Sequence, residues 1–93
     1  MKKVSSTDLP PEAQATLQQI QSGGNFPYPQ DGSVFKNLEK KLPIKPQNYY
    51  LEYTVETPGS ANRGQRRLIV GQGGEIYYTD DHYNGFQEVI IAS

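Results

Sequence analysis

Only one segment of this chain repeats its apolar residues with a helical period, and this limits the fold more than any other feature. Proline and glutamate at Pro10–Glu12 are typical of a helix start, because proline fits the first turn and an acidic residue faces the positive end of the helix dipole. Gly23 and Gly24 end the pattern. We therefore predict one helix over residues 11–22 in a single domain, residues 1–93. Its apolar stripe consists of Ala13, Leu17 and Ile20.

After residue 48 the sequence changes to short β-rich runs separated by turns of Gly, Asn and Asp. In the first run, Tyr49–Thr57, the side chains alternate in the manner of a half-buried strand. Further strands are predicted over residues 66–71, 75–79 and 86–91. One helix followed by strands joined at hairpin lengths is an α+β pattern. We predict an α+β fold in which one N-terminal helix packs on a twisted antiparallel sheet.

The alternation in the first β-rich run predicts two different faces of the sheet. The face that carries Leu51 is expected to pack on the helix, and the face that carries Glu52 to be open to solvent or to a substrate. We expect a short strand or an arm over residues 1–7. Residues 23–48 are rich in Gly, Pro, Asn and Asp and predict turns, with one short helical turn near Val34–Glu39. A long irregular stretch in a compact domain is often functional.

The composition excludes several classes of site. The chain has no cysteine and one histidine, which rules out disulfides, thiolate catalysis and Cys- or multi-His metal sites. The net charge of -1 argues against a broad nucleic-acid coat but allows a local cationic cleft. No apolar run approaches the ~20 residues that span a bilayer, and none follows the basic start as in a signal peptide. We expect no cofactor, no metal and no membrane association, in a cytoplasmic chain or a mature secreted form.

Three features of the β-rich region are candidates for chemistry: Glu52 in mid-strand, the arginines at 63, 66 and 67, and His82 before the last strand. Taken separately, each is more often a surface or structural feature. Together they suit RNA cleavage by transesterification, since RNA supplies its own nucleophile, the 2′-hydroxyl. That reaction needs a base, an acid and cations that hold the phosphorane charge. Glutamate and histidine can serve as base and acid near neutral pH, and arginine matches phosphate oxygens with parallel N–H groups.

The segment Phe35–Glu39 offers an aromatic face, successive backbone N–H groups and a carboxylate. Guanine fits this set, because its N1–H and N2–H₂ donors can both face a carboxylate while its O6 accepts from backbone N–H groups. The alternative is that Phe35 is a core residue and Glu39 a surface charge, which is the more frequent situation for such residues.

The sequence resembles the guanyl-specific microbial ribonucleases, the family of barnase and its shorter streptomycete relatives. The matching motifs run in family order over nearly the whole chain, so that together they are far more specific than any one of them. They are Leu9–Ala13, Phe26–Tyr28, Asp31-Gly32, Val34-Phe35, Asn37, Glu39, Leu42-Pro43, Tyr49-Tyr50, Glu52–Val55, Thr57–Gly59, Arg63-Gly64, Arg66-Arg67 and Asp81–Tyr83.

The resemblance implies a role for each matching position. Glu52 would be the general base and His82 the general acid, Arg63 and Arg67 would bind the phosphate, and Tyr83 would contact it. Glu39 would accept from the guanine edge, Asn37 and its neighbours would supply backbone N–H groups, and Phe35 would flank the base. The implied guanine-binding residues are Phe35, Lys36, Asn37, Leu38 and Glu39.

The implied activity is cleavage of single-stranded RNA on the 3′ side of guanosine through a 2′,3′-cyclic phosphate, which is then hydrolysed without a metal. The resemblance also implies a secreted monomer, and in several members a barstar-like inhibitor protein. The streptomycete disulfide that joins the two chain ends is absent, which removes roughly 2–4 kcal/mol of stability, although barnase also lacks cysteine. Lys36 and Leu38 differ from the residues that are common in the base-recognition loop of the family. Because that loop acts mainly through its backbone, we expect guanine binding to be altered and not lost.

Two alternatives stay open at the level of sequence. The chain could be an inactive or engineered family member that binds RNA or an inhibitor, or a structural α+β domain with accidental matches. The presence of base, acid and both phosphate arginines favours the active ribonuclease, because a binding module has no physical need for all four. The ordered series of motifs argues against accidental matches.

Overall fold

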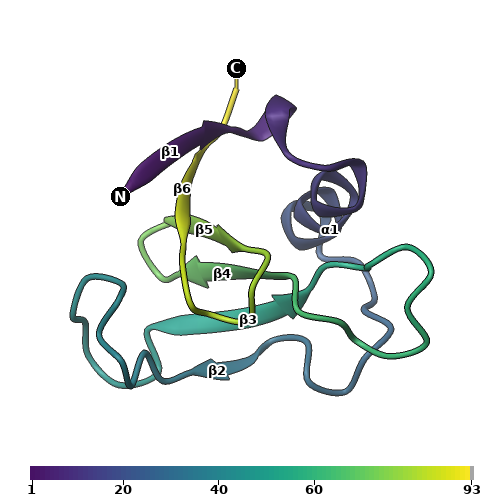
Figure 1. Cartoon of the computed structure of the whole chain (residues 1–93). Coiled ribbons are helices and arrows are strands. Elements are labelled where there is room, and N and C mark those ends of the chain that lie inside the picture. The colour runs from purple at the N-terminus through teal and green to yellow at the C-terminus, as the bar shows by residue number, and fades with distance from the viewer. Residues whose placement is uncertain (93) are drawn as a thin grey trace.

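A computed structural model of the protein describes residues 1–92. Within these residues the strands form one sheet in the order β1-β6-β5-β4-β3-β2, and the helix lies against one of its faces (Figure 1). The elements are β1 (Lys2–Ser5), a 3₁₀ turn (Ser6–Asp8), α1 (Pro11–Ser22), β2 (Ser33–Phe35), β3 (Tyr50–Thr54), β4 (Arg67–Gly71), β5 (Ile76–Thr79) and β6 (Gln87–Ile90).

Helix α1 occupies the predicted residues. Ala13 and Leu17 are buried and Ile20 packs against the same core, so the predicted apolar stripe faces the sheet. Gly23 ends the helix in the left-handed conformation, with φ of 69°, which lets Gly24 donate its N–H to the Gln19 carbonyl at 3.0 Å. A side chain with a Cβ would be strained at that φ.

The predicted α+β class is confirmed, and the sheet is antiparallel from β2 through β6. One strand pair departs from the antiparallel prediction, since β1 runs parallel to β6 and places Lys2 opposite Gln87. Strands from the two ends of the chain therefore lie side by side (Figure 1). The Ala92 N–H also donates to the Ser6 hydroxyl at 2.9 Å. Backbone pairing thus joins the two ends of the described part of the chain.

The helical turn predicted near Val34–Glu39 is wrong, because Ser33–Phe35 is strand β2, with Val34 opposite Leu51 of β3. The reason is tertiary. Strand β3 would otherwise leave a row of unpaired N–H and C=O groups, and valine and phenylalanine favour the extended backbone that satisfies them.

Apolar residues pack on both faces of the sheet. The helix side holds the larger core, and its position agrees with the predicted packing of α1. The opposite face, which carries Glu52, was expected to be open, but much of it is covered by Leu42 and a group of aromatic rings. The core on the helix side is Leu9, Ala13, Leu17, Val55, Leu68, Ile76, Tyr78 and Val89. The second cluster is Leu42, Tyr50, Ile69 and Tyr77, with Phe35, Tyr49, Tyr83 and Phe86 packed against it.

Candidate active site

Glu52 lies in the middle of β3, and its carboxylate is held by an arginine from the connection between β3 and β4. The Nη2 of Arg63 donates to Glu52 Oε1 at 2.8 Å, and the Nε of Arg63 donates to the Thr54 hydroxyl at 3.0 Å. Both charged side chains are partly buried. Because two donors of one planar guanidinium are fixed by two strand residues, the position and the orientation of Arg63 are both defined.

The second carboxylate oxygen of Glu52 also has a partner. The Tyr83 hydroxyl donates to Glu52 Oε2 at 3.1 Å. Burial of the ring, followed by the negative charge of Glu52, raises the pKa of Tyr83 to about 12. The phenol therefore keeps its proton at neutral pH and remains a donor toward this site.

Arg67 is a buried cation on the same face of the sheet. It is 3% exposed and lies between Thr54 and Thr79 of the adjacent strands. One guanidinium nitrogen, Nη1, donates to the Gly64 and Arg66 carbonyls at 3.1 and 2.8 Å. Its Nε is buried without a hydrogen-bond partner, and none of the carboxylates in residues 1–92 forms an ion pair with it. A buried charge without a counterion favours binding of an anion.

Arg66 extends toward the other side of the sheet. Its Nη1 lies 3.4 Å from Glu12 Oε1 on α1, so it belongs to the helix face. Neighbouring residues of an extended chain point to opposite faces. The separation of Arg67 from Arg66 therefore agrees with the alternation that the sequence predicts.

His82 and Tyr83 form a turn in which both residues have a left-handed backbone, with φ of 55° and 75°. For residues other than glycine this conformation costs of order 1–3 kcal/mol each, and it is concentrated at functional sites. The turn places the His82 ring 4.9 Å from the Tyr83 ring, measured between centroids. The exposed His82 ring thus lies beside the tyrosine that contacts Glu52.

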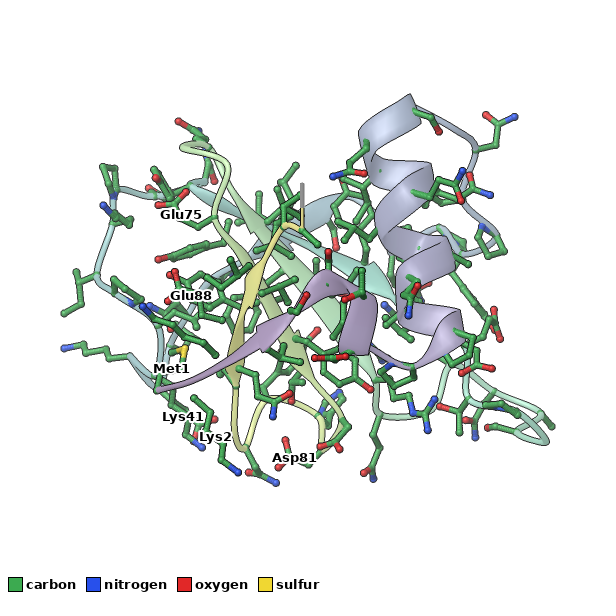
Figure 2. The ribbon with its side chains drawn as sticks, turned by 90° about the horizontal axis from the view of Figure 1, so that it is seen from above. Met1, Lys2, Lys41, Glu75, Asp81 and Glu88 are labelled. Carbon is green, nitrogen blue, oxygen red and sulfur yellow. The ribbon has the colours of Figure 1, made fainter. Side chains whose placement is uncertain are left out.

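Hydrogen bonds on both sides of this turn hold its backbone. The Thr79 hydroxyl donates to Asp81 Oδ1 at 2.8 Å and accepts from the Tyr83 N–H at 3.2 Å. The Gly85 N–H donates to the same Asp81 oxygen at 3.0 Å and is the main reason that the pKa of Asp81 is lowered. Asp81 and Glu75 flank β5 and lie at its opposite ends (Figure 2). The strained turn is therefore anchored to the end of a central strand.

A pocket of about 360 Å³ joins the predicted base-binding loop to the catalytic candidates. The Phe35 ring forms part of its wall and packs on the Tyr83 ring, with 4.7 Å between centroids. Glu39 lies at the rim, where its carboxylate is exposed and its nearest cation is Lys41 Nζ, at 4.0 Å. The wall consists of Val34, Phe35, Lys36, Asn37, Leu38, Glu39, Lys41, Glu52, Tyr83 and Phe86.

Asn37 fixes the shape of the loop. It has a left-handed backbone, with φ of 55°. Its side-chain amide donates to the Leu42 carbonyl at 3.0 Å, and its side-chain oxygen accepts from the Leu42 N–H at 3.1 Å. Leu42 is buried. The side chain of Asn37 is thus used inside the protein, and its carbonyl accepts from the Lys40 N–H at 3.0 Å, so both fix the loop.

The structure brings most of the predicted residues together, some by direct contact and others by a shared face of the sheet. Glu52 contacts Arg63 and Tyr83 directly, and Arg67 shares their face through strand register. Sequence reasoning missed three contributors to the site, which are Thr54, Lys41 and Phe86. Alternation along β3 could have identified Thr54, since it lies two residues after Glu52. Lys41 comes from a loop, where no periodicity indicates the direction of a side chain, and Phe86 lies just before β6 although the predicted strand included it.

Residues 1–92 offer neither a clustered metal site nor a membrane-spanning helix. These residues contain no cluster of three or more His, Asp or Glu side chains placed to hold a metal ion. No helix among them has the length and apolar character needed to cross a membrane.

Comparison with known proteins gives a consistent result. A family model described as ribonuclease matches residues 1–90. The chain is 51% identical to guanyl-specific ribonuclease St of Saccharopolyspora erythraea, over 97% of this chain and 89% of that protein. It is 57% identical to guanyl-specific ribonuclease Sa of Kitasatospora aureofaciens, over 84% of this chain and 82% of that protein.

Solved structures of a related protein superpose closely. Ribonuclease Sa2 in complexes with mononucleotides matches with a TM-score of 0.95 and 49% identity, covering 97% of this chain and 94% of that one. Ribonuclease Sa2 with guanosine-2′-cyclophosphate also matches with a TM-score of 0.95, at 47% identity over the full length of both chains. With the family model, the sequence relatives and the fold in agreement, this chain belongs to the ribonuclease family.

Proposed function

We propose that this protein is a guanyl-specific endoribonuclease that cleaves single-stranded RNA on the 3′ side of guanosine and needs no metal ion. One observation carries the proposal: the Glu52 carboxylate, held by Arg63 and Tyr83, lies in the wall of the same pocket as the loop 35–39. A base bound against that loop would present its ribose to the carboxylate. The names of the relatives and the guanosine-2′-cyclophosphate and 3′-GMP complexes of ribonuclease Sa2 support this assignment.

In the first step, Glu52 takes the proton of the ribose 2′-hydroxyl as that oxygen attacks the phosphorus. The bond between phosphorus and the 5′-oxygen of the next nucleotide breaks, and His82 protonates the departing oxygen. The product is a 2′,3′-cyclic phosphate. In the second step the roles reverse. His82 takes a proton from a water whose oxygen attacks the phosphorus, the bond between phosphorus and the 2′-oxygen breaks, and Glu52 returns a proton to that oxygen to give the 3′-phosphate.

Three donors would hold the charge that develops on the phosphorane oxygens. Arg63 and Tyr83 already point at Glu52, so a phosphate beside this carboxylate would lie within their reach. Arg67 contributes a positive charge that has no carboxylate partner among residues 1–92. Since these groups are fixed before the substrate binds, they stabilise the transition state without reorganisation.

Guanine recognition would use the rim of the pocket. The base would lie against the Phe35 ring, its O6 would accept backbone N–H groups of the loop that Asn37 braces, and Glu39 would accept from N1–H and N2–H₂. An ionised carboxylate has only acceptors. Adenine presents an acceptor at N1, which would face the carboxylate lone pairs, so this arrangement disfavours adenine.

Three further predictions come from the family resemblance, namely a monomer, secretion, and control by a barstar-like inhibitor. The exposed side chains of Glu39 and His82 would be accessible to such an inhibitor. Size-exclusion chromatography would test for a monomer, and addition of barstar would test for control by an inhibitor.

The proposed activity is tested with two dinucleotides. GpC and ApC are incubated separately with the protein in EDTA, and cyclic phosphate is measured. We expect guanosine 2′,3′-cyclic phosphate from GpC and a much slower reaction of ApC. Cleavage that requires added Mg²⁺ or Zn²⁺ would contradict the metal-independent mechanism. An inactive binding module would bind GpC but leave both dinucleotides intact.

A further inference from the structure

A second pocket, of about 420 Å³, borders the base-binding loop. It lies between the two arms of the connection from β2 to β3, with residues 34–38 and Lys40 in one wall and residues 44–50 in the other. Residues 34–38 also line the base pocket, so the two pockets share this segment. The second pocket includes neither Glu52 nor Tyr83, and it is therefore separate from the catalytic groups.

The walls of this second pocket are fixed by hydrogen bonds within the protein. The Tyr50 hydroxyl donates to the Pro43 carbonyl at 2.7 Å, which ties the loop to β3. The Tyr49 hydroxyl donates to Glu75 Oε2 at 2.6 Å, at the end of β5 opposite to Asp81 (Figure 2). Together with the Asn37–Leu42 bonds, these contacts hold the loop open before a ligand arrives, which lowers the entropic cost of binding.

The pocket is positively charged in a protein whose net charge is -1. Lys36, Lys40 and Lys45 line it, and none of them has a carboxylate oxygen within 4.0 Å in residues 1–92. The hydrogen bond from Tyr49 is the main cause of the lowered pKa of Glu75, and the positive charge of Lys45 lowers it further. Three lysines in the lining of one pocket, with no acidic residue in that lining, attract an anion with several charges, such as a phosphodiester chain.

Apolar and aromatic groups lie between these amines. Leu38 and Ile44 are 82% and 74% exposed, which is unusual for residues of this size. The Tyr49 ring also lines the pocket, with Lys45 Nζ 5.3 Å from its centroid. Apolar surface flanked by cations is the combination that binds single-stranded nucleic acid, because bases pack on the former and phosphates contact the latter.

The position of the pocket distinguishes the two directions of an RNA strand. The phosphate on the 3′ side of a bound guanosine must reach Glu52 and His82, so the nucleotides that follow it leave the site past His82. The second pocket lies along the base loop and contains none of these groups. This exclusion leaves the nucleotides on the 5′ side of the guanosine as its ligands.

We propose that this second pocket is a nucleotide subsite that binds the RNA immediately 5′ of the cleaved guanosine, through Lys40 and Lys45 and the apolar surface of Leu38 and Ile44. The proposal rests on the function proposed above, since the direction of the strand depends on the guanosine being bound in the first pocket.

Binding of strands that cannot be cleaved separates the subsite from the chemistry. A 2′-deoxyguanosine, written X, removes the nucleophile, and fluorescence anisotropy gives the Kd of labelled XpC, ApApXpC and XpCpApA. We expect the two 5′ nucleotides to tighten binding roughly tenfold relative to XpC, in the range of base stacking on a protein surface. The double variant Lys40→Gln/Lys45→Gln should lose most of that gain and bind XpC and XpCpApA as the wild type does.

A matched control removes the same charge elsewhere. Lys2→Gln/Lys3→Gln alters β1, at the edge of the sheet opposite to β2, and should keep the 5′ gain. In the Lys40/Lys45 variant, the slope of log Kd against log salt concentration for ApApXpC should fall by about 0.7 for each phosphate that is no longer neutralised. The proposal is overturned if the 5′ nucleotides add no affinity, or if both double variants weaken ApApXpC equally.

Measuring the cleavage of GpC separates a loss of 5′ binding from a loss of catalytic activity. The Lys40/Lys45 variant should cleave GpC at the wild-type rate, which also shows that it is folded. A wild type that binds ApApXpC more tightly than XpC but does not cleave GpC would overturn the proposed function and support the subsite.

Discussion

Glu52 and Glu39 border the same pocket, but the protein holds the two carboxylates in very different ways. The Glu52 side chain is 16% exposed and receives hydrogen bonds from Arg63 at 2.8 Å and Tyr83 at 3.1 Å. The Glu39 side chain is 70% exposed, and its nearest cation, Lys41, is 4.0 Å away. The first is built into a strand and the second stands on a loop.

The difference follows from the proposed roles of the two ends of the pocket, which are catalysis and base selection. Stabilising a transition state requires donors that are already in place, because any reorganisation would add to the barrier. Selecting a base requires only that the correct ligand replaces water on the loop better than the wrong one does. We therefore expect substitutions at the strand end to lower the rate, and substitutions at the loop end to change selectivity.

The largest expected effect is the loss of the proposed base or acid. Glu52→Gln and His82→Gln should each lower kcat for GpC by a factor of roughly 10²–10⁴. The wild-type pH–rate profile should be bell-shaped, because the base must be ionised and the acid protonated in the same molecule. Each variant should lose one limb of the profile, the acidic limb for Glu52→Gln and the alkaline limb for His82→Gln. Circular dichroism checks the fold, and a folded His82→Gln variant with near-wild-type kcat would contradict the assignment.

The next effect separates two adjacent arginines. Arg67→Ala should lower kcat/KM by roughly 10²–10³, the range found for removal of one transition-state donor. Arg66→Ala loses a partly exposed ion pair with Glu12 and should change kcat/KM little. Because Arg67 is buried, Arg67→Met serves as a variant that retains most of the side-chain volume. Thermal unfolding of all three variants identifies losses of kcat/KM that come from a destabilised fold. Equal losses of kcat/KM for Arg66→Ala and Arg67→Ala would mean that the two faces of the sheet are misassigned.

Base selectivity is expected to depend on Glu39. Glu39→Ala removes the acceptor for guanine, and Glu39→Gln brings an NH₂ that can face the guanine donors. Each should reduce the ratio of kcat/KM on GpC to that on ApC by about 5-fold to 100-fold, since an unpaired polar group costs about 1–3 kcal/mol. The rate on ApC should hardly change. If the ratio is preserved within error, Glu39 is a surface charge.

The smallest effect concerns the loop itself. Asn37→Gly permits the positive φ but removes both side-chain hydrogen bonds to Leu42. We expect KM for GpC to rise a fewfold, on the order of 1 kcal/mol for removal of this brace, while kcat is retained. Asn37→Ala adds backbone strain and should be less stable than Asn37→Gly in urea unfolding. A fall in kcat with unchanged KM would show that the loop acts on the chemistry.

Several features followed from the sequence alone because their causes are local. Helix α1 was predicted over the residues that it occupies, since an apolar period, a proline start and a glycine stop act within a few residues. Alternation along an extended chain is equally local, so the sequence separated Arg67 from Arg66 and placed Arg67 on the Glu52 face.

Other features depended on residues far apart in the chain. The parallel pairing of β1 with β6 and the pairing of β2 with β3 satisfy backbone groups that no local pattern identifies. Nor does the sequence indicate that the Tyr83 hydroxyl reaches Glu52, or that Leu42 covers part of a face expected to be open. Both pockets likewise arise from loops that fold back on the sheet. Sequence periodicity sets the direction of side chains within an element, whereas contacts between elements are decided by packing and hydrogen bonding across the whole chain.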